Sequence, residues 1–305
     1  MTNIIMDSGA FSAWTQGMEI DIDNYADFAL ENLNYISYVV NLDVIPSKWG
    51  KRPSKEEADQ AARQGWENYK YMVKKGIPED RIIHVFHQDE EFSWLNKFVK
   101  EGLKYIGISP ANDRNVKEKI LWLDQCMNHI TDSEGMPLNK WHGFAVTSLR
   151  IMMRYPWYSV DSSSWAAISR MGAIIIPRLK NYKWAYDKQS WILGVTPRSP
   201  YRNKITKHID NLSPAMKKMA LEYIHSKGYR LGKSVFKKVS PEYRLKSNEI
   251  WYEKGRIVEI IKKKGIINDH RQRNEINILY FQDLASSMPE WPWPFEKKRR
   301  RGFVL

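Results

Sequence analysis

Short apolar runs alternate with longer amphipathic stretches over the first 180 residues of the chain. Many of these runs are apolar at consecutive positions, as strands covered on both faces should be. This alternation predicts a parallel α/β fold, either a closed barrel or an open doubly wound sheet. The predicted strands cover residues 3–6, 38–43, 82–86, 105–108, 142–146, 157–160 and 173–176.

The clearest helix signal begins at Pro53. Ser54 and Glu57 have the spacing of a capping box, in which each residue satisfies a backbone N–H near the other. Apolar side chains then recur along one helical face as far as Val73. Similar patterns predict further helices at 22–33, 91–101, 114–130 and 162–171.

The pattern changes after Arg178. We expect a hairpin or an irregular segment at 182–195, a helix from about Ser213 to Lys227, and a late strand at 276–281. The final segment is too rich in proline to be helical. These features predict a catalytic barrel core at 1–180, a region at 181–290 that completes the barrel and adds a basic lobe, and a basic tail at 291–305.

Charge is distributed unevenly along a chain whose net charge is +13. Residues 178–305 hold 29 Lys and Arg against 12 Asp and Glu, whereas residues 1–177 hold 19 against 23. The excess indicates a polyanionic partner, nucleic acid above all, for the C-terminal part, although a solvated basic face would give the same count. The basic residues that we expect to contact nucleic acid are Arg178, Lys262, Lys263, Lys264, Arg271 and Arg273.

The single cysteine, Cys126, excludes an internal disulfide and a multi-cysteine zinc site. His84 and His87 lie three positions apart on one predicted strand, so they point to opposite faces and are poorly placed to share an ion. We therefore expect no metal. The chain has no apolar run that could span a membrane and no signal-peptide pattern, so we expect a cytoplasmic protein without a membrane partner.

Polar or small residues follow one predicted strand after another. The first run ends on Asp7-Ser8-Gly9, the second on Asp43, the third on Gln88 and the sixth on Asp161. Because the carboxyl ends of parallel strands share one rim, these side chains should converge there, although any one of them could simply cap the next helix. Two carboxylates at one rim suit displacement at a sugar carbon, where one attacks and the other transfers protons.

Two motifs resemble those of the tRNA-guanine transglycosylases. Asp7-Ser8-Gly9-Ala10-Phe11 resembles their DSGGF motif, and the segment from Val160 to Trp165 resembles the FDSASY motif of their archaeal branch. Gly143 precedes Asp161 by 18 positions, close to the gap between the GAGHP and FDS segments of that branch. The pairing of these last segments looks most like the phage and bacterial relatives, which exchange guanine for a 7-deazaguanine in DNA.

The resemblance covers about residues 3–178 and implies a TIM-type (β/α)8 barrel. It implies that Asp161 is the nucleophile that bonds C1′ of the target nucleoside, and that Asp7 moves the proton at N9 of the bases. It implies a role in base binding for Ser8, Phe11, Asp43, Gln88, Gly107 and Ile108. The implied partners are DNA and a free 7-deazaguanine base such as 7-cyano-7-deazaguanine, in the host cytoplasm if the chain is phage-encoded, and a protein partner is also possible.

The chain departs from the family in two ways. The cysteines that hold the structural zinc of the tRNA enzymes are missing, so we expect no zinc cofactor. Only six residues precede Asp7, where the family has barrel strands, so we expect the barrel to be incomplete, rearranged, or closed by 173–178 with 190–195 or 276–281. The alternatives to DNA-guanine exchange are the same exchange on tRNA, a base-removing N-glycosidase, and a basic nucleic-acid-binding protein without activity.

Overall fold

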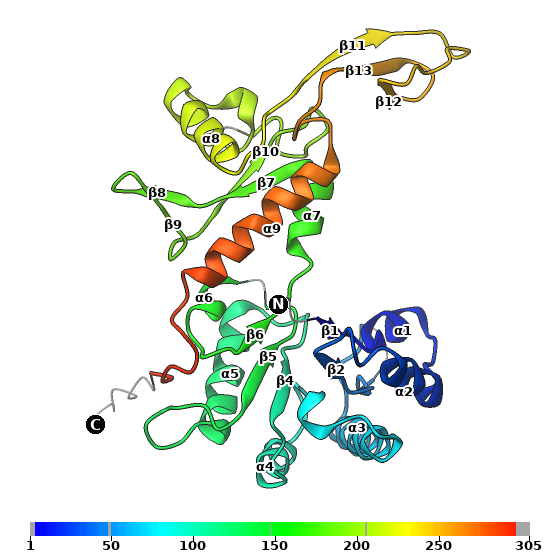
Figure 1. Ribbon diagram of the computed structural model, residues 1–305, viewed down its shortest axis with the longest axis vertical. Coiled ribbons are helices and arrows are strands. Elements are labelled where there is room, and N and C mark those ends of the chain that lie inside the picture. The colour runs from blue at the N-terminus through cyan, green and yellow to red at the C-terminus, as the bar shows by residue number, and fades with distance from the viewer. Residues whose placement is uncertain (1–3, 48–49, 147, 205, 297–305) are drawn as a thin grey trace. The chain divides into compact units, whose positions relative to one another are not determined.

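The computed structural model describes residues 4–47, 50–146, 148–204 and 206–296 (Figure 1). The chain divides into two compact units. The first contains residues 1–162 together with residues 289–305, and the second contains residues 163–288. Each unit is described by itself below.

A curled parallel sheet of six strands forms the centre of the first unit, with its strands in chain order (Figure 1). The neighbours pair in parallel throughout, from Ile5 opposite Tyr38 at one edge to Gly143 opposite Val160 at the other. The strands are β1 (Ile5–Met6), β2 (Tyr38–Val40), β3 (Ile82–His87), β4 (Tyr105–Ser109), β5 (Lys140–Gly143) and β6 (Ser159–Val160).

Helices connect successive strands of this sheet, and α2 to α5 follow one another around its outer face (Figure 1). Right-handed crossovers in constant order place every connecting helix on one side, which makes the sheet curl. The helices are α1 (Ala10–Gln16), α2 (Ile22–Glu31), α3 (Lys55–Lys75), α4 (Phe92–Lys100), α5 (Val116–Ile130) and α6 (Leu149–Met152), with a 3-10 turn η1 at Glu79–Arg81.

The capping box predicted for α3 is confirmed. The Ser54 hydroxyl accepts from the Glu57 N–H at 3.2 Å, and the Glu57 carboxylate accepts from the Ser54 N–H at 2.7 Å. The α/β prediction is also confirmed, whereas a full eight-stranded barrel is not observed: among the described residues, the parallel sheet has six strands.

Side chains alternate between the two faces of the curled sheet. On the outer face, His84 and Phe86 pack against Trp66 and Phe98 of the covering helices. On the inner face, Val40, Ile83, Val85 and Tyr105 form a second buried cluster, bordered by Ile5, Tyr38, Phe144 and Tyr158. Both faces are therefore apolar, which explains the consecutive apolar positions in the sequence.

The second unit surrounds a short antiparallel pair of strands, β7 (Ala173–Ile176) and β10 (Trp191–Gly194). Its core includes side chains of both strands and of two helices, α8 (Pro214–Ser226) and α9 (His270–Ser286). The remaining elements are α7 (Ser164–Arg170), the hairpin β8 (Arg178–Lys180) and β9 (Lys183–Ala185), and a 3-10 turn η2 (Ile209–Asn211). The segments expected to close the barrel, 173–178 and 190–195, thus contain strands that pair with each other.

The strand predicted at 276–281 is wrong, because these residues lie inside α9. Ile276, Tyr280 and Leu284 are buried four positions apart, which is the period of a helix. The apolar residues between Ile276 and Phe281 fit a strand when this short segment is taken alone, whereas the longer sequence around them has a helical pattern.

A three-stranded antiparallel sheet extends from the second unit, in the order β11-β13-β12 (Figure 1). It consists of β11 (Lys233–Lys238), β12 (Glu249–Glu253) and β13 (Ile257–Lys263), and we call it the basic arm. Most residues of β11 are exposed, including the four consecutive residues from Val235 to Lys238.

The described part of the C-terminal segment packs on the first unit. The Trp291 indole donates to the Pro156 carbonyl at 3.1 Å and lies edge-on to Tyr158, while Phe295 is buried beside Tyr155. The predicted basic tail from residue 297 onward lies outside the described residues. Within the described chain, no helix combines the length and apolar character needed to cross a membrane.

Candidate active site at the carboxyl ends of the strands

The acidic side chains predicted to converge all follow the carboxyl ends of parallel strands. Asp7 follows β1, Asp43 lies shortly after β2, and Asp161 follows β6. The Asp7 carboxyl has a raised pKa, first because it is desolvated by the surrounding protein, and then because of the negative charges of Asp43 and Asp161. Three carboxyl groups from separate strands therefore share one electrostatic environment.

Asp43 is the centre of a small hydrogen-bond network. Its Oδ1 accepts from the Ser8 hydroxyl at 3.2 Å, and its Oδ2 lies 2.8 Å from His87 Nε2. The Ser8 hydroxyl also accepts from the Ala10 N–H, which fixes the turn after β1. Gly9 in this turn has φ of 75°, a left-handed conformation that glycine adopts without strain. The opening DSG sequence thus builds a tight turn that links β1 to Asp43.

His87 and Glu90 extend this network into the protein interior. Burial alone would lower the pKa of His87, but its hydrogen bond to Asp43 and the charges of Asp43 and Glu90 raise it overall. Burial raises the pKa of Glu90 to about 8, and its Oε2 has no hydrogen-bond partner. Neither residue was assigned a role from the sequence, and only His87 was noted there, as an unsuitable metal ligand.

Asp161 is held at the opposite edge of the sheet. Its Oδ1 accepts from the Ala145 N–H at 2.8 Å and lies 3.4 Å from His142 Nε2. Ala145 has φ of 51°, and this left-handed turn after β5 directs its N–H toward the carboxylate. The Asp161 side chain is 55% exposed, so a substrate in solution could reach it.

A cavity of about 550 Å³ is lined in part by His87 of the Asp43 network, whereas Asp7, Asp43 and Asp161 are not among its lining residues. Its walls come from the ends of β3 and β4, from the segment around Pro46 and Pro53, and from α1. The lining includes aromatic Phe11 and Trp14, polar His87, Gln88 and Ser109, and the charged residues Lys51, Arg52, Asp89, Asp113 and Arg114. An apolar hollow with a few convergent polar groups is the usual form of a small-molecule site.

The predicted base-binding residues occupy different positions around this cavity. Phe11 and Gln88 line it, and Gln88 Oε1 accepts from the Ala111 N–H at 3.0 Å. Ser8 and Asp43 are not among the lining residues; Asp43 contacts His87, which lines the cavity, and Ser8 donates to Asp43. Gly107 and Ile108 are buried inside β4, where Gly107 leaves room for the Phe144 ring, and the cavity wall is made instead by Ser109 to Ala111.

Neither the scan of protein-family models nor the search of curated proteins found a match to this chain. The assignment of the site therefore depends on its own geometry and on the motifs in the sequence.

The predicted nucleic-acid contacts all lie in the second unit. Five of the six side chains are exposed; Arg178 donates to the Gln189 carbonyl, and Lys264 pairs with Asp269 at 3.0 Å. Arg273 differs, because it is buried and its guanidinium donates to the carbonyls of Ser169 and Ile266. Arg273 is a structural residue of this unit, and its position on the buried face of α9 is what the sequence prediction overlooked.

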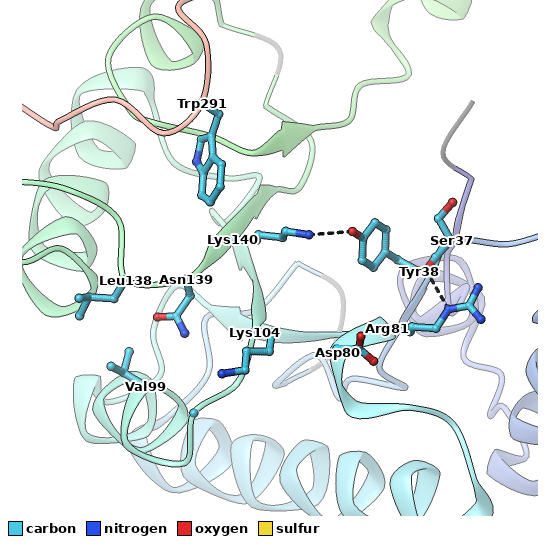
Figure 2. Close-up of a pocket in the computed structure, with 11 residues that line it drawn as sticks. Ser37, Tyr38, Asp80, Arg81, Val99, Lys104, Leu138, Asn139, Lys140 and Trp291 are labelled. Atoms are coloured by element: carbon cyan, nitrogen blue, oxygen red, sulfur yellow. Dashed lines mark hydrogen bonds between the residues drawn. The ribbon is translucent and has the colours of Figure 1, made fainter. Parts of the chain in front are cut away.

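A second hollow of about 890 Å³ lies at the amino-terminal ends of β2 to β5 (Figure 2). Lys140 reaches toward Tyr38 and donates to its hydroxyl at 2.9 Å, and the Arg81 guanidinium donates to the Ser37 carbonyl (Figure 2). Arg81 also donates to the Leu33 carbonyl at 2.8 Å. These cations are already engaged by the chain itself. Since active sites of parallel α/β folds lie at the opposite rim, we assign this hollow no chemistry.

The described residues contain no group of three or more His, Cys, Asp and Glu side chains arranged to hold a metal ion.

Proposed function

We propose that this protein exchanges guanine in DNA for a 7-deazaguanine, such as 7-cyano-7-deazaguanine, through a covalent aspartyl-glycosyl intermediate. The proposal depends on one observation: two carboxyl groups, Asp7 and Asp161, follow strands at the same rim of the sheet, and each has its own set of neighbours. Asp7 follows β1 and has a raised pKa, caused first by desolvation. Asp161 follows β6, where its Oδ1 accepts from the Ala145 N–H and lies 3.4 Å from His142 Nε2. Carboxyl groups in contrasting environments take the separate roles of acid and nucleophile.

In the first step, an Asp161 oxygen attacks C1′ while the C1′–N9 bond breaks, and the departing guanine takes a proton at N9 from Asp7. In the second step, the incoming base gives its N9 proton to Asp7 and attacks C1′, and the Asp161 carboxylate leaves. Two inversions retain the configuration at C1′, and the ester keeps the strand intact between the two bases. The raised pKa of Asp7 suits this role, because it shifts the group toward the protonated form that gives a proton to the departing base.

The cavity beside Phe11 and Gln88 suits a planar base. Phe11 offers a ring face, and the amide of Gln88 offers a polar edge within a hollow of about 550 Å³. A base in duplex DNA must leave the stack to enter such a cavity, and enzymes that act on bases hold the extruded base by stacking and edge contacts.

We further propose that the curled sheet is an incomplete version of a TIM-type barrel. Its strand order, its outer helices and its site at the carboxyl ends agree with that fold, while β7 and β10 belong to a different sheet. The exposed lysines of the second unit, including Lys262 and Lys263 at the end of β13, support a role of this basic lobe in binding the DNA backbone.

The test is base exchange by purified wild type and Asp161→Ala. The protein is incubated with a guanine-containing DNA duplex and 7-cyano-7-deazaguanine, and the DNA is then digested and its nucleosides are measured by mass spectrometry. The wild type should insert the deazaguanine into unbroken DNA. Asp161→Ala should show no exchange while keeping the wild-type circular dichroism spectrum, because it lacks the nucleophile.

Parallel reactions separate the alternatives. Exchange confined to tRNA would replace DNA as the substrate, and abasic sites without an added base would indicate an N-glycosidase. Exchange that persists in Asp161→Ala would refute the nucleophile assignment. Asp7→Asn serves as the second variant: it keeps the nucleophile but should lose at least about 100-fold in rate, the scale of general acid–base catalysis.

A further inference from the structure

A chain of hydrogen-bonding side chains runs along the inner face of the sheet to Asp161. His142 and Ser159 are register partners on β5 and β6, so their side chains point to the same face. His142 Nδ1 lies 2.6 Å from the Ser159 hydroxyl, and that hydroxyl also contacts the Tyr105 hydroxyl from β4. On its other side, His142 Nε2 lies 3.4 Å from Asp161 Oδ1.

The order of these groups determines the direction of their protons. A carboxylate accepts only, so an imidazole that hydrogen-bonds to Asp161 does so through Nε2–H, and we infer this tautomer from the 3.4 Å separation. In a neutral ring, Nδ1 is then an acceptor, and the Ser159 hydroxyl must donate to it. Ser159 in turn accepts from Tyr105. In this arrangement every donor points toward Asp161. The Ser159 hydroxyl fixes Nδ1 of His142 as the acceptor, so the ring is held in one tautomer.

We propose that His142 is a positioning residue that holds one oxygen of the Asp161 nucleophile, and this inference rests on the proposed function. The Ala145 N–H donates to Oδ1 at 2.8 Å, and His142 Nε2 lies 3.4 Å from the same oxygen. Oδ2 is left to attack C1′. A fixed carboxylate reaches C1′ in one orientation, and misplacement by about 1 Å can cost about 100-fold in rate.

The same contact acts in both steps of the exchange. As the C1′–Oδ2 bond forms and the C1′–N9 bond breaks, the carboxylate becomes a neutral ester, and His142 retains its proton. When the incoming base displaces the ester, the electron pair of the C1′–Oδ2 bond returns to the carboxylate, where Nε2–H stabilises the restored negative charge on Oδ1. Loss of His142 should therefore slow both the formation and the decay of the intermediate.

The burial of His142 agrees with this role. The residue is 3% exposed, whereas Asp161 beyond it is 55% exposed on its side chain. The ring is also clamped edge-on against Phe144, with centroids 4.5 Å apart. A substrate could thus reach Asp161 while His142 stays behind it, shielded from water and fixed in orientation.

The experiment compares His142→Leu with His142→Gln. Leucine fills the space without a donor, whereas the glutamine amide can place an N–H near the position of Nε2. We expect His142→Leu to lower the single-turnover rate of adduct formation by about 10- to 100-fold, with the KM for DNA unchanged. His142→Gln should recover most of this loss. His208→Leu serves as the matched control, because it removes another buried histidine, whose ring nitrogens contact the Thr196 carbonyl and the N–H and carboxylate of Asp210 in the second unit; it should keep the wild-type rate.

The outcomes separate this inference from the proposed function. A wild type that forms no adduct with any substrate refutes the proposed function. An active wild type with an equally active His142→Leu overturns the positioning role alone, as does an equal loss in His142→Leu and His142→Gln. Nitrogen-15 NMR of the free protein gives a readout without substrate: a proton on His142 Nε2 supports the inference, and an Nε2 without a proton overturns it.

Discussion

Asp7 and Glu90 are acidic residues near the same rim whose pKa values are both raised, and burial is the first cause in each case. They differ in access, since Asp7 keeps contact with solvent and Glu90 is 6% exposed. Only an accessible group can exchange protons with a bound base. We therefore propose that Asp7 transfers the proton. Glu90 is a buried group whose negative charge helps to raise the pKa of His87.

The variant Glu90→Gln tests how much the buried, ionised Glu90 carboxylate lowers the free energy of unfolding. The folded pKa of Glu90, about 8, lies above its ordinary value of 4.5, so the native state binds the proton more tightly than the unfolded state does. Stability should therefore fall as pH rises from about 4.5 to 8. Glutamine does not ionise, so the free energy of unfolding of the variant should not fall in this way. Above pH 8 the variant should be more stable than wild type by an amount on the order of a few kcal/mol.

Urea unfolding of both proteins across this pH range measures the difference. The two curves should converge at pH values below about 4.5, where the wild-type residue is protonated in both states. A wild-type advantage at high pH would contradict the assignment.

At the scale of elements, helix α9 supports the strand β7 through a single amide. The Asn277 Oδ1 accepts from the Ile175 N–H at 2.8 Å, and its Nδ2 donates to the Trp165 carbonyl at 3.0 Å. Asn277 is fully buried. The helix thus satisfies backbone groups of β7 that a further strand would otherwise bind, which is how a short two-stranded sheet can have a buried edge.

Asn277→Ala should therefore destabilise the second unit by at least about 2 kcal/mol, because it leaves buried backbone groups of β7 and α7 without partners. Hydrogen exchange of the Ile175 amide, followed by mass spectrometry or NMR, measures the loss locally. Asn274→Ala on the same helix is the control, since Asn274 has none of these contacts to β7, and it should change stability little. Unchanged protection of Ile175 in Asn277→Ala would show that the amide does not support the strand.

At the scale of the whole molecule, positive charge and candidate chemistry lie on different parts of the chain. The six-stranded sheet carries the acidic site, whereas most of the excess lysine and arginine follows residue 178. Such a division suits a polyanionic substrate, because backbone phosphates bind cations while the reacting base enters a separate cavity.

Replacement of Lys262, Lys263 and Lys264 together by glutamine tests this division. We expect weaker DNA binding for all sequences, and a shallower dependence of affinity on salt, by about one unit of slope for each lost phosphate contact. Fluorescence anisotropy with labelled duplexes at several salt concentrations measures both. The matched variant replaces Lys74, Lys100 and Lys117, three exposed lysines of the first unit, and should bind like wild type. Equal losses in the two variants would show that net charge alone drives binding.

The sequence by itself determined the local elements. Alternating apolar runs, the capping box at Ser54 and Glu57, and the polar residues after each strand were sufficient to predict an α/β fold with acidic side chains at one rim. These signals are local because they depend on hydrogen bonds and side-chain periodicity within a few residues. The strand predicted at 276–281 was wrong for the same reason, since a short apolar run fits either period.

Only the tertiary structure decided which strands pair and which side chains meet. The separation of β7 and β10 from the parallel sheet depends on long-range pairing and on Asn277, which no local pattern reports. The approach of His142 to Asp161 depends on the register between β5 and β6, which brings residues 19 positions apart into contact. Register is set by the packing of whole faces, so these contacts exist only once the sheet has formed.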